Sequence, residues 1–238
     1  MGRAYEVRKA AIAKTGALKS KLYANYAKEI YTAAKNGGVD ATSNANLKRL
    51  LDKAKKEQIP SDIIKRAIDK VNTGIQENYT ELRYEGFGPS NATIIIDCLT
   101  DNVNRTISYI RGAFAKTKSK LGVSGSVSYM YDNLAVISFK GLNEEEVLEV
   151  LINKNIDIID IEIEDELITL YGKPNDIHKI KEAVITFKND IIFDTDEIMM
   201  IPKDTINLNA DDLETFKKLL ELLNNIEDVN NIYHNVSI

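Results

Sequence analysis

The chain has 238 residues, of which 44% are hydrophobic and 28% charged, a composition typical of a soluble globular protein. It contains no apolar run near the roughly 20 residues of a membrane helix, and Met1 to Lys21 lacks the apolar segment of a secretory signal. Cys98 is the only cysteine, which excludes a disulfide within the chain and predicts a reducing, cytoplasmic location.

The net charge of -5 conceals an uneven distribution. Residues 1–75 carry 16 Lys/Arg and 7 Asp/Glu, whereas residues 132–238 carry 9 and 24. The segment 76–131 is close to neutral, with 6 Lys/Arg and 5 Asp/Glu. A basic end on an acidic body favours a polyanionic partner such as nucleic acid. The alternatives are a chance gradient and an electrostatic attraction between the two ends of the chain.

Apolar spacing in the first 76 residues predicts three short amphipathic helices, which would form a small basic bundle. They are expected over residues 17–35, 44–54 and 61–73. The segment 77–132 is predicted to contain strands over 79–87, 92–99 and 126–131 and a helix over 102–116. The tail 203–238 is predicted to contain a strand over 205–208, a helix over 211–224 and a strand over 229–235.

The acidic block 133–202 follows the order β-α-β-β-α-β, which is the order of a ferredoxin-like domain. We therefore predict an α+β protein with an N-terminal three-helix bundle and two ferredoxin-like domains, one inserted in the other. The first of these is split between 77–132 and 203–238. The alternative is a linear string of domains, and the pairing of the last strand distinguishes the two.

Lys14, Lys21, Lys28 and Lys35 are seven residues apart, so on a continuous helix they would form a single stripe. Phosphates bind such cations, and bases stack on exposed rings. Nucleic-acid binding is also predicted for Arg3, Tyr5, Arg8, Lys9, Lys19, Lys48 and Arg49. The alternative is a solvated helix face with tyrosines in the core.

A second candidate lies where a predicted strand meets a helix. Asp101 or Asn102 can cap that helix, and Asn104 and Arg105 follow in its first turn, where an anion or partner contact is expected. The glycine-containing segments 86–88 and 122–125 could cradle phosphate, but they lack P-loop and dinucleotide spacing, which favours tight turns.

The sequence predicts no catalytic residues, no metal site and no cofactor. His178 and His234 lie in different predicted domains, and Cys98 falls in an apolar run typical of a buried strand. The acidic cluster of Asp194, Asp196 and Glu197 is more typical of a solvated loop than of a cation site.

Four segments resemble one family, YebC/PmpR, in its shorter YeeN-like branch. They are Arg83–Pro89 (RYEGFGP), Leu99–Thr106 (LTDNVNRT), Gly125–Asp132 (GSVSYMYD) and Tyr233–Val236 (YHNV). The resemblance implies a helical domain and two ferredoxin-like domains, and a DNA-binding transcriptional regulator. It also implies an alternative, since mitochondrial relatives are translation factors that help ribosomes through difficult sequences such as proline runs.

The chain departs from the family at its start. Where the family begins Gly-His-Ser-Lys-Trp, this sequence has Gly2, Arg3, Ala4 and Tyr5, so Tyr5 would replace the aromatic ring and one lysine is missing. The leading hypothesis is a non-catalytic nucleic-acid-binding regulator whose acidic domain docks a protein; the oligomeric state is left open, with a monomer favoured. The alternatives are a ribosome-associated factor that contacts ribosomal RNA or tRNA, and a small-ligand sensor at the interface of the two ferredoxin-like domains.

Overall fold

The computed structural model describes residues 19–74 and 76–238. Compactness divides these residues into two units. One contains residues 19–127 and 208–232, and the other contains residues 128–207 and 233–238. The helical bundle and most of the split sheet therefore belong to one unit. The boundaries proposed for three separate domains stay a prediction.

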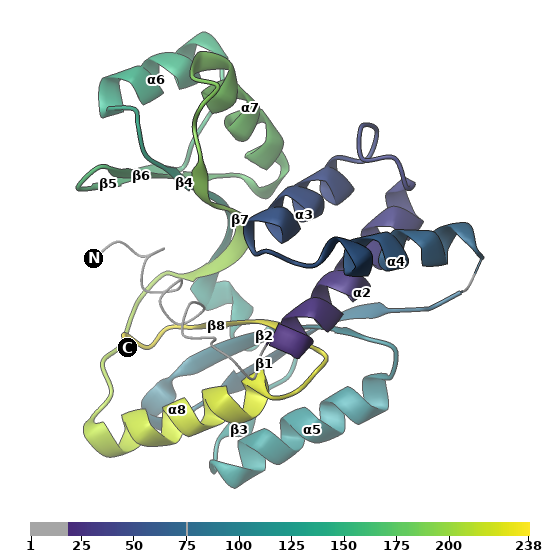
Figure 1. Ribbon diagram of the computed structural model, residues 1–238. Coiled ribbons are helices and arrows are strands. Elements are labelled where there is room, and N and C mark those ends of the chain that lie inside the picture. The colour runs from purple at the N-terminus through teal and green to yellow at the C-terminus, as the bar shows by residue number, and fades with distance from the viewer. Residues whose placement is uncertain (1–18, 75) are drawn as a thin grey trace. The chain divides into compact units, whose positions relative to one another are not determined.

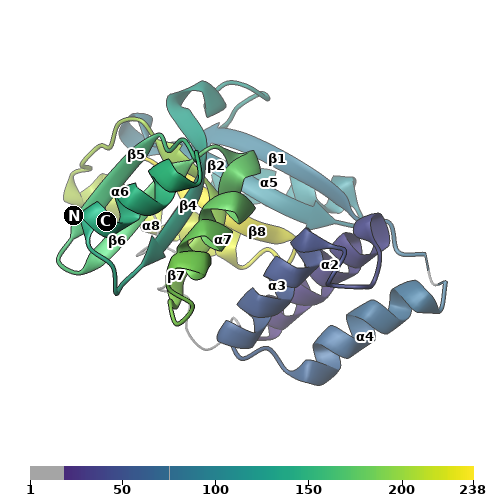
Figure 2. The ribbon, with the colours of Figure 1, turned by 90° about the horizontal axis from the view of Figure 1, so that it is seen from above.

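The three helices predicted at the N-terminus are confirmed, as α2 (Lys19–Gly37), α3 (Ala45–Lys56) and α4 (Ser61–Asn72). Figures 1 and 2 both show α2 next to α3 and α4. Their apolar faces share a core that includes Ile30, Leu47 and Ala67. Asn44 caps α3 by accepting a hydrogen bond from the Leu47 amide, and its own amide group donates to Ala33 O.

The first sheet has the order β3-β1-β2-β8. Its strands are β1 (Thr80–Phe87), β2 (Thr93–Thr100), β3 (Lys120–Leu121) and β8 (Val229–His234). Helices α5 (Val103–Lys116) and α8 (Ala210–Asn224) lie side by side on this sheet (Figure 1). A 3-10 turn, η1 (Pro89–Asn91), joins β1 to β2. Because β8 lies beside β2, the C-terminal tail returns to the sheet that β1 and β2 begin.

Two strand predictions were wrong. Residues 126–131 were expected to form a strand, but they contain a 3-10 turn, η2 (Ser128–Met130), because the buried Glu85 carboxylate accepts the backbone N–H groups of Gly125 and Val127. In the expected strand 205–208, Ile206 makes a single parallel bridge, to Val236. Neither segment forms a strand of the first sheet. The other two strands beside β2 and β8 are the short β3 and the predicted β1, which pairs along its length with β2.

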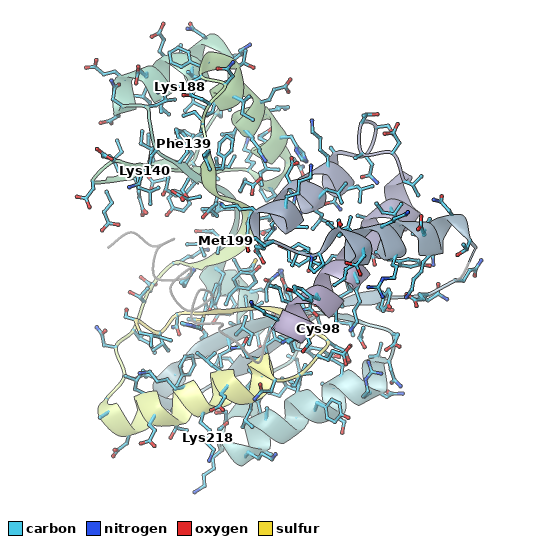
Figure 3. All side chains as sticks on the ribbon, in the orientation of Figure 1. Cys98, Phe139, Lys140, Lys188, Met199 and Lys218 are labelled. Carbon is cyan, nitrogen blue, oxygen red and sulfur yellow. The ribbon has the colours of Figure 1, made fainter. Side chains whose placement is uncertain are left out.

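The inserted domain confirms the predicted ferredoxin-like order, with the sheet β5-β6-β4-β7. Its elements are β4 (Tyr131–Phe139), α6 (Glu144–Asn153), β5 (Asp160–Glu164), β6 (Leu167–Gly172), η3 (Pro174–Asp176), α7 (Ile177–Phe187) and β7 (Phe193–Pro202). Phe139 lies between the sheet and the two helices in a core with Val147 and Ile180 (Figure 3). Within the described parts of the chain, no helix has the length and apolarity needed to span a membrane.

Candidate nucleic-acid interface

The lysine stripe of α2 is hydrogen-bonded to the chain itself. Lys21 Nζ donates to Asn224 O at 2.6 Å, and Lys28 Nζ donates to Asp228 Oδ1 at 2.9 Å. Lys35 Nζ donates to two oxygens, one from Glu77 and one from Asn78, at 2.9 Å each. Contact of these lysines with nucleic acid stays a prediction, and the structure gives each of them an acceptor within the same compact unit.

Other polar residues of α2 continue this contact. Asn25 Nδ2 donates to Val229 O at 3.3 Å, and Glu29 Oε1 accepts a hydrogen bond from Asn230 Nδ2 at 2.6 Å. One face of α2 is thus docked on residues 224–230, which end α8 and begin β8. The attraction between the basic and acidic ends of the chain, an alternative that the charge distribution left open, is therefore present in this contact.

Asp228 is the centre of that contact. Its side chain is 1% exposed, and it accepts hydrogen bonds from Lys28, from Arg105 Nη2 at 2.7 Å and from Thr106 Oγ1 at 2.9 Å. Burial opposes ionisation of the carboxyl, but the hydrogen bonds from Arg105, Lys28 and Thr106 outweigh burial and lower the pKa of Asp228. The carboxylate therefore stays charged between two cations.

Arg105 was expected to bind an anion or a partner, and the anion that it binds here belongs to the chain. Its guanidinium bridges Asp228 and Asp101, at 2.7 Å from each, and these hydrogen bonds raise the pKa of Arg105. Asn102 is the cap of α5, since its side chain accepts from the Arg105 amide, while Asn104 is exposed. An external contact at Asn104 and Arg105 stays a prediction.

The glycine-containing loop 122–125, which the sequence analysis weighed as a phosphate site, binds a carboxylate of the chain itself. Glu85 is 3% exposed, and its oxygens accept from Gly125 N at 2.9 Å and from Val127 N at 2.5 Å. The Gly122 amide donates to Glu85 O at 2.8 Å. Because the Glu85 carboxylate accepts the backbone N–H groups of Gly125 and Val127, it stabilises this loop as a turn.

Helix α3 is rich in cations. Its 12 residues contain five Lys/Arg and one Asp. Lys48, Lys55 and Lys56 are exposed, and the half-buried Arg49 donates to Asn46 at 3.3 Å. Lys48 and Lys55, seven residues apart, lie on one line of the helix. Lys19, also exposed, begins α2.

A second cationic surface, missed by the sequence reasoning, lies along α5 and β3. Residues 102–131 contain five Lys/Arg and no Asp or Glu, a contrast that the near-neutral count for 76–131 concealed. Tyr109, on α5, is 57% exposed. The exposed cations of this surface are Arg111, Lys116, Lys118 and Lys120. A charge count in shorter windows would have found this segment.

Two groups that the sequence analysis weighed for chemistry, Cys98 and the acidic cluster near Asp196, have the following surroundings. The thiol of Cys98 is buried, and burial with the nearby Asp97 raises its pKa to about 12. Asp196, in the acidic cluster, pairs with Lys181 at 2.5 Å. Among residues 19–74 and 76–238, no group of three or more His, Cys, Asp or Glu is placed to hold a metal ion.

Five of the predicted nucleic-acid contacts come from residues 1–18, which lie outside the part of the chain that the structure describes. They are those of Arg3, Tyr5, Arg8, Lys9 and Lys14.

Two family models match nearly the whole length of the chain. Residues 3–74 match the model of the TACO1/YebC protein N-terminal domain, and residues 79–236 match that of the TACO1/YebC second and third domain. A relative from Alteromonas mediterranea is 46% identical over 99% of this chain and 98% of its own length. A relative from Marinobacter nauticus is 46% identical over 100% of this chain and 99% of its own length. Both relatives are named probable transcriptional regulatory proteins.

A solved structure shows the same fold. The crystal structure of the conserved hypothetical protein Aq1575 from Aquifex aeolicus superposes with a TM-score of 0.78 at 30% identity. The alignment covers 94% of this chain and 92% of that one. Two family models that together span nearly all residues, and full-length relatives at 46% identity, agree with the resemblance that the sequence motifs indicated. The chain belongs to the TACO1/YebC family.

Proposed function

We propose that the protein is a non-catalytic regulator of gene expression that binds DNA through the outer face of α3. The names of its relatives, probable transcriptional regulatory proteins, support the regulatory role. The observation that carries the binding surface is the exposure of Lys48, Lys55 and Lys56 on a helix whose other face is fixed in the bundle core. The lysines of α2 are already bonded to internal acceptors.

The proposed contact is electrostatic. Helix α3 is about 18 Å long at about 1.5 Å per residue, so its cations can meet several phosphates of one strand. The basic residues in its last turn also offset the partial negative charge at a helix C-terminus, and Lys53, Lys55 and Lys56 occupy that turn. Phosphate contacts position a protein on DNA without reading its sequence, so we expect weak sequence preference.

The surface along α5 and β3 belongs to the same compact unit as α3. Its exposed cations and the exposed ring of Tyr109 supply the groups that bind phosphates and stack on unpaired bases. It supports nucleic acid as the partner and offers a second place of contact.

Charge reversal tests this proposal. Binding of a fluorescent 20-base-pair duplex is measured by anisotropy for the wild type and for Lys48→Glu/Lys55→Glu. We expect the variant to bind at least about tenfold more weakly, because two phosphate contacts become repulsions. The matched control is Lys217→Glu/Lys218→Glu, which changes the net charge equally on α8, from which Lys218 extends outward (Figure 3). Equal losses in both variants would refute the role of α3.

The cellular target is tested separately. In a sucrose gradient of a cell extract, the protein should sediment with chromosomal DNA and be released by DNase. Sedimentation with ribosomes or their subunits that survives DNase would contradict the DNA form of the proposal and support the translation factor.

A further inference from the structure

Strand β5 is at the edge of the inserted sheet. The sheet order is β5-β6-β4-β7, and among the described residues β5 pairs only with β6, from Asp160 opposite Tyr171 to Glu164 opposite Leu167. An edge strand carries backbone N–H and C=O groups on its outer side that can pair with another extended chain.

The side chains of β5 alternate between acidic and aliphatic. Ile161 and Ile163 lie opposite Leu170 and Ile168, which belong to the core beneath α6 and α7. Asp160, Glu162 and Glu164 therefore project from the other face of the sheet. Ile163 is 44% exposed, and Ile159, just before the strand, is 56% exposed.

Charged residues on an edge strand commonly prevent aggregation, and their sign also discriminates between strands that could pair with that edge. Antiparallel pairing of β5 with a second copy would set its row of carboxylates against an identical row, and like charges opposite each other destabilise a sheet. A basic strand would meet no such repulsion. The exposed isoleucines would gain apolar contacts from the added chain.

The surrounding sequence reinforces this preference. Residues 144–166 contain ten Asp/Glu and one Lys. Such a field attracts cationic segments at long range, accelerates their encounter and disfavours acidic ones.

We propose that the outer edge of β5 binds an extended basic segment of a partner protein as a fifth strand of the inserted sheet. The segment alternates lysine or arginine with aliphatic residues. Its basic side chains lie next to Asp160, Glu162 and Glu164, and its aliphatic side chains lie next to Ile161 and Ile163. This docking does not depend on the binding of nucleic acid, so the two proposals can fail separately.

The probe is a fluorescent peptide, Lys-Val-Lys-Ile-Lys-Val-Lys, titrated with the full chain and followed by anisotropy. A peptide of the same composition with the lysines at one end tests alternation, and one with N-methyl groups on alternate residues tests backbone pairing. We expect both controls to bind at least tenfold more weakly than the probe. Hydrogen exchange of the backbone amides between residues 160 and 164 should slow in the complex.

Two charge-reversal variants locate the site. Asp160→Lys/Glu164→Lys should bind the probe about tenfold more weakly, because two cross-strand attractions become repulsions. Glu149→Lys/Glu182→Lys, on α6 and α7 of the same domain, changes the charge equally and should keep full affinity. Circular dichroism establishes that both variants are folded. Equal binding of the clustered peptide, or equal losses in both variants, would overturn the proposal.

Discussion

Lys28 and Asp228, 200 residues apart in the chain, form an ion pair of 2.9 Å that is shielded from solvent, with side chains 11% and 1% exposed. It joins the basic helical bundle to the turn between α8 and β8. Part of the charge asymmetry of the sequence therefore lies in an internal ion pair of the fold.

Replacement of Asp228 should destabilise the protein substantially. Asp228→Asn leaves Lys28 and Arg105 without their shared carboxylate, and removal of one member of a buried charge network costs about 3 kcal/mol or more. Urea unfolding followed by circular dichroism measures this change. The matched control is Glu227→Gln, because Glu227 is 69% exposed and 3.8 Å from Lys28. Its effect should be within about 0.5 kcal/mol, and similar effects of the two substitutions would contradict the central role of Asp228.

Stability should also fall in mildly acidic solution because of His234. Burial lowers the pKa of this side chain from 6.5 to about 4, against an opposing hydrogen bond with the Val236 backbone. The folded state therefore favours neutral imidazole, and its contribution is present above pH 6.5 and is lost as the pH falls toward 4.

Thermal unfolding at pH 7 and pH 5 measures this contribution. A His178→Asn background removes the only other histidine. Equal melting temperatures at the two pH values, with His234 unprotonated throughout in an NMR titration, would contradict the buried neutral imidazole.

Cys98 should be inert to thiol reagents while the protein is folded. Its side chain lies in β2 (Figure 3) and is 3% exposed, and burial raises the pKa of the thiol to about 12. At pH 8, labelling with a chromogenic disulfide should therefore proceed at the rate of unfolding and accelerate with urea. Complete labelling within seconds without denaturant would mean that the strand opens locally.

Two glycine substitutions should have opposite effects. A Cβ at Gly86 would lie 2.4 Å from the Phe114 ring, so Gly86→Ala should destabilise the fold by about 1 to 3 kcal/mol. Gly112 lies within α5 and a Cβ there would meet nothing within 4 Å, so Gly112→Ala should stabilise it by about 0.5 to 1 kcal/mol. Urea midpoints measure both changes, and a stabilising Gly86→Ala would show that β1 does not pack against α5 as described.

The sequence predicted the regular elements well where periodicity was strong. The helices of the bundle, and the two α-helices and four strands of the inserted domain, follow from apolar spacing and capping residues such as Asn143, which forms a capping box with Glu146. The strand expected over residues 126–131 failed because its alternation could not show that Glu85, 40 residues earlier, binds the backbone of this segment.

The candidate site was harder to predict for a similar reason. Spacing placed Lys21, Lys28 and Lys35 on one face of a helix, but a solvent-facing stripe and a docking stripe have the same periodicity. The acceptors of Lys21 and Lys28, Asn224 O and Asp228 Oδ1, are 203 and 200 residues away in sequence. Asn224 O and the Glu77 O that accepts from Lys35 are backbone carbonyls, which no side-chain pattern reveals. Because Lys21 and Lys28 bond to Asn224 and Asp228, charge reversal of these two lysines is expected to disrupt the docking of α2.

The salt dependence of DNA binding tests most directly whether α3, and not α2, contacts phosphate. The logarithm of the binding constant for a duplex is plotted against the logarithm of the salt concentration, where each phosphate contact contributes a slope of about -0.9. The slope for Lys48→Ala/Lys55→Ala should be shallower than that of the wild type by about 1.8, and the slope for Lys21→Ala/Lys35→Ala should be unchanged. A slope that becomes shallower only in the α2 variant would contradict the account.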